Sequence, residues 1–91
     1  MGLTFNDYQL IKNSGLFDPI YYLYNYPDVR IADIDPLRHF MKTGWKEGRN
    51  PSEAFDTQYY LSSNPDVRAM QIDPLVHYIS YGRKEGRQIR R

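Results

Sequence analysis

A segment of 37 residues occurs twice in this chain, and the two copies align at a constant offset of 38 positions. The first copy spans residues 17–53 and the second spans residues 55–91, with 19 of the 37 aligned pairs identical. Self-similarity with a period of about 20 to 50 residues is typical of repeat architectures, in which neighbouring units share one core. We therefore expect one small domain of two repeats, residues 17–54 (repeat 1) and residues 55–91 (repeat 2), behind an N-terminal cap over residues 1–16.

Each repeat contains three short segments that are typical of helix starts. Asp18 and Asp35 each stand directly before a proline, so we expect their carboxylates to cap two helices whose first turn holds that proline. Between them Pro27 begins a further helix, and the equivalent helix of repeat 2 is preceded by Asn64. Because Asn caps helices well and Tyr26 at the equivalent position does not, we expect the repeat 2 helix to be better capped by about 1 kcal/mol.

The last predicted helix of each repeat carries an apolar stripe. Leu37, Phe40 and Met41 have the i, i+3 and i+4 spacing that places side chains on one helix face, and repeat 2 has apolar residues at the same positions. Gly44 and Gly82 follow these stripes, where a left-handed residue would close the helix. The Lys-Glu-Gly-Arg sequence that comes next in both repeats predicts a tight turn.

The residues before the repeats predict one more helix, running from Asn6 or Asp7 as its cap to about Asn13, with Ser14-Gly15 as its stop. Two units are fewer than the three that usually make a stable array. We expect this helix to cover the open end of repeat 1, and a homodimer would be the other way to bury that surface. The predicted fold is all-α, with two repeats of about three short helices each behind a capping helix.

Composition limits the range of functions. The chain has 91 residues, no Cys and a formal net charge of +1, so neither disulfides nor thiolate metal sites are expected. No stretch approaches the 18 apolar residues of a membrane span, which predicts a soluble protein with no membrane span. The absence of Cys favours the cytoplasm, while a place in a secreted or surface protein stays open.

His39 and His77 are the side chains that most invite a catalytic or metal-binding interpretation, because they occupy equivalent positions. Each follows a helix-start aspartate by four residues, so we expect the ring to pack against its own helix start, on Ile34 in repeat 1. One His per repeat is too few for a metal site, and no nucleophile or phosphate-binding motif is present. We expect no enzyme activity, no catalytic or metal site and no cofactor. A hydrolase would need both imidazoles in one cleft.

Basic residues recur near tyrosines in both repeats, a combination that could bind single-stranded nucleic acid or sugar. Acidic neighbours offer a simpler interpretation. In each repeat two carboxylates stand beside three basic residues. They are Asp28 and Glu47 beside Arg30, Lys46 and Arg49, and Asp66 and Glu85 beside Arg68, Lys84 and Arg87. We therefore expect local ion pairs first.

The shared pattern FDxxYYLxxxPDVRxxxIDPLxHxxxxGxKEGR resembles a repeat found in bacterial surface-polysaccharide proteins, where tandem units occur beside glycosyltransferase domains, and in some large secreted repeat proteins. The resemblance covers residues 17–91 and implies an accessory module. It implies no catalytic or ligand-binding residue.

The favoured interpretation is a non-catalytic interaction module that binds a protein or a glycan, accessory to surface-polysaccharide enzymes. The alternative is a small stand-alone regulator or inhibitor, such as one carried by a phage, that docks through its basic C-terminus on nucleic acid or on a nucleic-acid-binding protein. Partner binding is expected where the repeats differ and where the C-terminus is basic. The candidate residues are Arg38, Trp45, Arg83, Lys84, Arg87, Arg90 and Arg91.

Overall fold

Seven short α-helices account for most of residues 5–91, the part of the chain that the computed structural model describes, and these residues form no β-strand. The all-α prediction is therefore confirmed. The helices are α1 (Phe5–Ser14), α2 (Pro19–Asn25), α3 (Pro27–Ala32), α4 (Pro36–His39), α5 (Thr57–Ser63), α6 (Pro65–Met70) and α7 (Pro74–His77), with π-helical turns η1 (Phe40–Gly44) after α4 and η2 (Tyr78–Gly82) after α7. Among residues 5–91 no helix is long and apolar enough to cross a bilayer.

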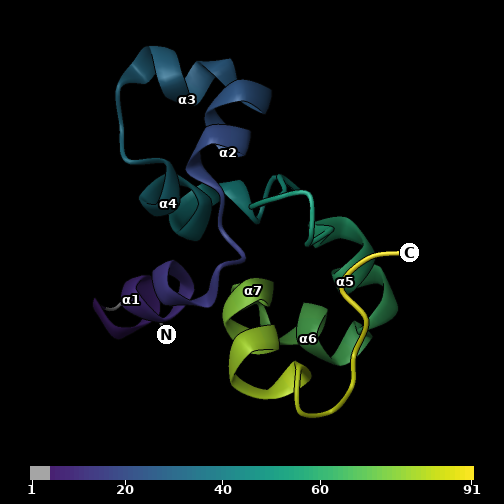
Figure 1. Cartoon of the computed structure of the whole chain (residues 1–91). Helices are drawn as coiled ribbons and strands as arrows, with labels where there is room; N and C mark the ends of the chain where they lie inside the picture. The colour runs from purple at the N-terminus through teal and green to yellow at the C-terminus, as the bar shows by residue number, and fades with distance from the viewer. Residues whose placement is uncertain (1–4) are drawn as a thin grey trace.

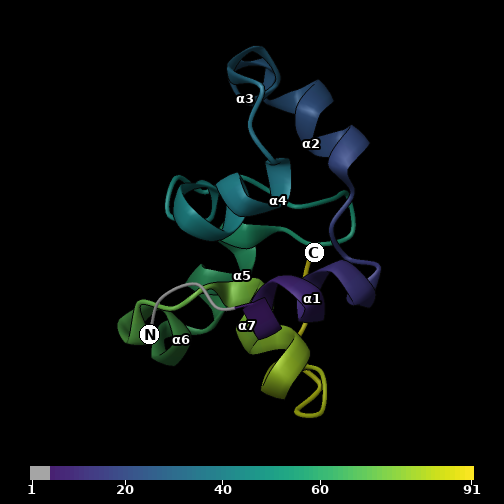
Figure 2. The same cartoon turned by 90° about the vertical axis from the view of Figure 1, so that its left-hand side faces the viewer.

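The two repeats form the two halves of the molecule, with α2, α3 and α4 on one side and α5, α6 and α7 on the other (Figures 1 and 2). Helix α1 packs against α4 of repeat 1 and against both α7 and η2 of repeat 2. The prediction that α1 covers the open end of repeat 1 is therefore wrong in its scope, because α1 bridges both repeats. The predicted cap at Asn6 or Asp7 is wrong, because both residues lie inside the helix. The predicted stop is confirmed, since the helix ends at Ser14 and Gly15 is left-handed with φ of 78°.

Four of the helices begin directly after an aspartate whose side chain accepts hydrogen bonds from backbone N–H groups of the first turn. Asp18 accepts hydrogen bonds from the backbone N–H groups of Ile20 and Tyr21 at 3.0 and 3.1 Å. Asp35 accepts one from Leu37 at 2.9 Å, and repeat 2 uses its own aspartates in the same way. These hydrogen bonds confirm the predicted aspartate caps. A carboxylate at this position also offsets the positive end of a short helix.

The predicted cap by Asn64 is wrong. Its side chain makes no hydrogen bond to α6; instead its amide nitrogen donates to the Tyr60 carbonyl at 2.7 Å, and its Oδ1 accepts from Arg87 at 2.8 Å. The backbone at Asn64, with φ of −128° and ψ of 75°, matches that of Tyr26. The expected difference of about 1 kcal/mol in capping has no structural basis.

Gly44 and Gly82 do not end their helices in the left-handed conformation, so this prediction is wrong as well. The chain continues through a π-helical turn, in which Trp45 N–H bonds the Phe40 carbonyl at 3.1 Å. The left-handed residues come four positions later, at Gly48 with φ of 80° and Gly86 with φ of 72°. After Gly48, the Arg49 N–H donates a hydrogen bond to the Gly44 carbonyl at 2.9 Å, as in the Schellman motif.

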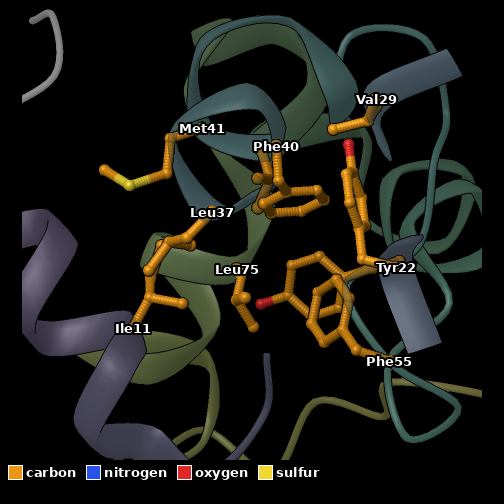
Figure 3. Packing of buried hydrophobic residues seen from close by; sticks show 10 residues of the cluster. Ile11, Tyr22, Val29, Leu37, Phe40, Met41, Phe55 and Leu75 are labelled. Atoms are coloured by element: carbon orange, nitrogen blue, oxygen red, sulfur yellow. The ribbon is translucent and has the colours of Figure 1, made fainter. Parts of the chain in front are cut away.

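One apolar cluster runs through both repeats. Figure 3 shows the Ile11 side chain of α1 pointing toward Leu37, with Leu75 of repeat 2 alongside. Ile11 and Leu75 are fully buried and Leu37 is nearly so. Each such aliphatic side chain contributes about 1.5–3 kcal/mol when it leaves water. Through Ile11, helix α1 thus packs against both repeats and joins their small cores into one.

Candidate binding groove between the two repeats

The two histidines are held by tyrosines of their own repeats. The Tyr22 hydroxyl lies 2.8 Å from His39 Nδ1, and the Tyr60 hydroxyl lies 2.9 Å from His77 Nδ1. Burial raises the pKa of Tyr60 to about 12 and lowers the pKa of His77. The Tyr60–His77 pair therefore stays uncharged near neutral pH. Each tyrosine–histidine pair anchors one helix to another within its repeat.

The glycines of the π-helical turns explain this arrangement. A Cβ on Gly44 would collide with the Tyr22 hydroxyl, and one on Gly82 would collide with the Tyr60 hydroxyl. Sequence reasoning assigned these glycines to helix ends and missed the tyrosines' role. The Tyr, His and Gly positions that the repeats share form a structural lock in each repeat. Within residues 5–91 no group of three or more His, Cys, Asp or Glu side chains could hold a metal ion.

The predicted ion pairs are confirmed in repeat 1 for Arg49, one of its three candidate basic residues. Arg49 binds both carboxylate oxygens of Asp28, at 2.8 and 3.0 Å, and also pairs with Glu47 at 2.9 Å. Its guanidinium lies 4.9 Å from the centre of the Tyr26 ring. The hydrogen bonds from Arg49 hold the pKa of Asp28 below its usual value. Bidentate pairing of this kind fixes orientation as well as charge.

Repeat 2 has the same ion pairs around Arg87, one of the candidate partner-binding residues. Arg87 binds the two oxygens of Asp66 at 3.0 and 3.1 Å, and Glu85 at 2.8 Å. Contact with these carboxylates raises the pKa of Arg87. The Arg87 guanidinium is thus occupied within the protein, which makes it a poor anchor for an external partner.

Four of the other basic candidates lie against the molecule's own rings or carbonyls. Arg38 stands over the Tyr8 ring of α1 at 5.0 Å, far along the chain from the C-terminal candidates. The rest gather on repeat 2, where Lys84 is exposed, Arg83 lies 5.5 Å from the Tyr78 ring centre, Arg91 lies 5.5 Å from the Tyr59 ring centre and Arg90 donates to the Glu53 carbonyl at 3.4 Å. These basic candidates therefore have different local partners, on α1, on repeat 2 and at the linker.

Trp45, the remaining candidate, lines a cavity. A groove of about 510 Å³ lies between the turn that ends repeat 1 and the helices α5 and α6 of repeat 2. Its size falls in the range of ordinary ligand pockets, roughly 300–1,000 Å³. Its lining residues are Trp45, Lys46, Glu47, Gly48, Gln58, Leu61, Arg68 and Gln71.

The Trp45 ring has a fixed position in this groove. Its Nε1–H donates to the Met41 carbonyl at 3.0 Å, and the ring packs against the core while remaining partly exposed. Lys46 Nζ lies 5.8 Å from the ring centre. The groove thus combines a held aromatic surface with a nearby cation.

The walls of the groove are held together by the linker between the repeats. The Thr57 hydroxyl donates to the Arg49 carbonyl at 2.8 Å, and the Thr57 N–H donates to the Asn50 side-chain oxygen at 2.9 Å. Asn50 in turn donates its own N–H to the Tyr26 hydroxyl at 2.8 Å. Repeat 1 has Pro19 where repeat 2 has Thr57, and a proline could not donate this hydrogen bond. The mismatch is therefore an adaptation to the junction.

Sequence reasoning identified Trp45 as a candidate and considered Lys46 and Arg68 for sugar or nucleic-acid binding, but it missed the two glutamines of the groove. Gln58 and Gln71 were not singled out, although their equivalents in repeat 1 are Ile20 and Asp33. Those differences were the available signal, because positions that meet a neighbouring repeat experience different surroundings in the two copies. Comparison of the chain with protein-family models, with curated proteins and with solved structures gave no match.

Proposed function

We propose that the chain is a non-catalytic binding module and that the groove between its repeats holds a segment of glycan. The observation that carries this proposal is the composition of the groove. A held indole ring lies among side chains with planar polar groups, contributed by Glu47, Gln58, Arg68 and Gln71. Such a mixture suits a ligand that is apolar on one face and rich in hydroxyls at its edges.

A pyranose ring has this character. Its axial C–H bonds present an apolar face that can stack on Trp45, and large aromatic surfaces give up much water when they are covered. Its equatorial hydroxyls both donate and accept hydrogen bonds. Gln58 and Gln71 can do both as well, while Arg68 donates and Glu47 accepts.

The role we propose is an accessory one, in which the module keeps an enzyme or a cell-surface structure near a polysaccharide. The resemblance of the repeats to those of bacterial surface-polysaccharide proteins supports this context. The pairing of Arg49 and Arg87 with carboxylates inside the protein leaves fewer free cations for the alternative, docking on nucleic acid.

Trp45 is the one tryptophan of the chain, so its fluorescence reports directly on the groove. We would titrate the protein with maltotriose, chitotriose and an acidic hyaluronan tetrasaccharide, and repeat each titration by isothermal calorimetry. Saturable quenching or a blue shift with a Kd between about 10 µM and 1 mM is the expected result for at least one of these glycans.

Three variants separate groove binding from binding elsewhere. Arg68→Ala removes an exposed side chain that lines the groove, and Trp45→Arg copies the residue of repeat 2 at that position. Both should weaken binding at least tenfold, whereas Arg38→Val, which also copies repeat 2, should leave it unchanged. The proposal fails if none of the three glycans binds, or if binding survives in both groove variants. Binding of single-stranded nucleic acid that weakens steeply with salt would support the alternative instead.

A further inference from the structure

The turn that closes one wall of the groove has a second, uncovered copy at the other end of the molecule. Within the chain, Gly48 approaches α5 so closely that a Cβ on it would collide with the side-chain amide of Gln58. The equivalent turn of repeat 2, residues 83–86, is exposed, and a Cβ on Gly86 would stand in open space. We call residues 83–86 the free turn.

Repeat 1 carries the matching uncovered helix surface. The residues of α5 and α6 that line the groove have equivalents on and just after α2 and α3, which are Ile20, Leu23, Arg30 and Asp33. We call these four residues the free helix face. Ile20 is 80% exposed, and Tyr24 one turn further along α2 is 81% exposed. Large apolar side chains gathered at the surface of a small protein commonly mark a binding site.

The two free surfaces differ from the internal junction in a complementary way. At the internal junction the turn presents Trp45 and the helix surface presents Gln71, both uncharged. At the same positions the free turn has Arg83 and the free helix face has Asp33. Opposite charges thus appear where a contact between two molecules would need steering.

We propose that two copies of this chain bind head to tail, with the free turn of one molecule seated on the free helix face of the next. The free helix face belongs to the half that contains α2 and α3, and the free turn lies in the opposite half (Figures 1 and 2). Because the two surfaces are different, each contact leaves one of each kind unfilled. Association therefore continues into chains or closes into a ring, and does not stop at a symmetric dimer.

This contact is weaker than the internal junction. No covalent linker joins two molecules, and Pro19 cannot donate the hydrogen bond that Thr57 makes to Asn50 at 2.9 Å. A dissociation constant in the range of about 10 µM to 1 mM follows from a small interface of this kind. The proposal is independent of whether the groove binds a glycan.

Sedimentation equilibrium between about 10 µM and 1 mM protein tests the proposal. We expect the average mass to rise beyond that of a dimer, and to fall again in high salt because the contact pairs Arg83 and Lys84 with Asp33. A protein that stays monomeric throughout this range would overturn the proposal. A mass that levels off at two copies would overturn it too, because it would indicate a symmetric dimer.

A mixing experiment tests the direction of the contact. Ile20→Lys blocks the free helix face and Lys84→Glu blocks the free turn, and both positions are exposed, so circular dichroism should show intact folds. Each variant alone should be monomeric. An equal mixture should form a one-to-one pair and go no further, because each variant retains one working surface. Tyr81→Lys, an exposed position outside both surfaces, should associate like the unmodified chain, and a mixture that stays monomeric refutes the head-to-tail geometry.

Discussion

The starts of α4 and α7 have the same Ile-Asp-Pro-Leu sequence and the same aspartate cap, yet their surroundings differ. Asp35 is exposed, and its second oxygen accepts a hydrogen bond from Tyr8 of α1 at 2.7 Å. The second oxygen of Asp73 is shut off from solvent and has no hydrogen-bond partner. This burial raises the pKa of Asp73 from 3.8 to about 7. The backbone hydrogen bonds of the cap lower the pKa in part, and the negative charge of Asp7 raises it further.

The difference arises because one helix serves two repeats. Helix α1 packs on α4 and on α7, but its side chains can match only one of the two starts. Tyr8 meets the carboxylate of repeat 1, whereas on the side of repeat 2 α1 brings a second carboxylate, Asp7. Equal sequences in a repeat protein therefore do not imply equal energetics. The lock formed by Tyr, His and Gly is nearly symmetric, and the surface covered by α1 is not.

The largest expected effect concerns the locks. Gly44→Ala and Gly82→Ala should each destabilise the fold by about 3 kcal/mol, because the new methyl group displaces the tyrosine hydroxyl and breaks its bond to histidine. Adding Tyr22→Phe to Gly44→Ala should recover part of the loss. Gly86→Ala is the control, since it meets no atom within 4 Å and should cost only about 1 kcal/mol for its positive φ. Urea unfolding measures all four, and equal losses at Gly44 and Gly86 would contradict the lock.

Replacing the buried carboxylate of Asp73 tests whether the starts of α4 and α7 differ in stability as their surroundings do. Asp73→Asn keeps a capping oxygen and removes a charge that is costly to bury. We expect it to stabilise the protein by about 1–2 kcal/mol at pH 8, or roughly 5–10 °C in Tm. Asp35→Asn should bring no such gain, since Asp35 is exposed and accepts from Tyr8.

The sign of the pH dependence follows from the raised pKa. Between pH 4 and about 7, folded Asp73 keeps a proton that the unfolded chain has already lost, so stability falls as the pH rises through this range. The gain from Asp73→Asn should therefore be small at pH 4 and complete above pH 7. His77, whose pKa is lowered by burial, acts in the opposite direction below about pH 6.5, but it contributes equally to both proteins and cancels in their difference. A gain independent of pH would contradict the assignment.

The smallest expected effect is the difference in stability loss between Tyr60→Phe and Tyr22→Phe. Tyr60→Phe leaves His77 Nδ1 without its partner in a buried place, and should cost about 1–2 kcal/mol. Tyr22→Phe should cost less, because the half-buried His39 can turn to water. Thermal unfolding of the two variants side by side measures the difference. A larger loss in repeat 1 would show that solvent access does not set the cost of breaking the lock.

The sequence was enough to predict features that depend on local chemistry. Aspartate before proline is a signal contained in two residues, and Asp18 and Asp35 cap their helices as expected. The locks were not predictable in this way. Tyr22 and His39 are separated by 17 residues, and no periodic pattern connects them. The π-helical turn that brings Gly44 under the tyrosine also has no sequence signature that the repeats reveal.

The groove was predictable in part, unlike the aspartate caps of the repeats, which were fully predictable, and the locks, which were not. Trp45 was singled out because the repeats differ there, and that reasoning was sound for a residue at a junction. Gln58 escaped notice because its partner surface, the turn around Gly48, is identified only when the path of the linker is known. Mismatch between copies thus marks junction positions, while the fold is needed to show which of them face each other.

The placement of α1 also has a consequence for synthesis on the ribosome. The contacts that lock repeat 1 join residues only 17 positions apart, and loops of this length close in well under a microsecond. Repeat 1 can therefore fold while repeat 2 is still being made, because translation adds only about 5–20 residues per second. Helix α1 packs on α7 as well as on α4, and α7 is synthesised more than 50 residues later. Helix α1 therefore leaves the ribosome well before its second partner, and until α7 follows, the nascent chain exposes Ile11 to any chaperone within reach.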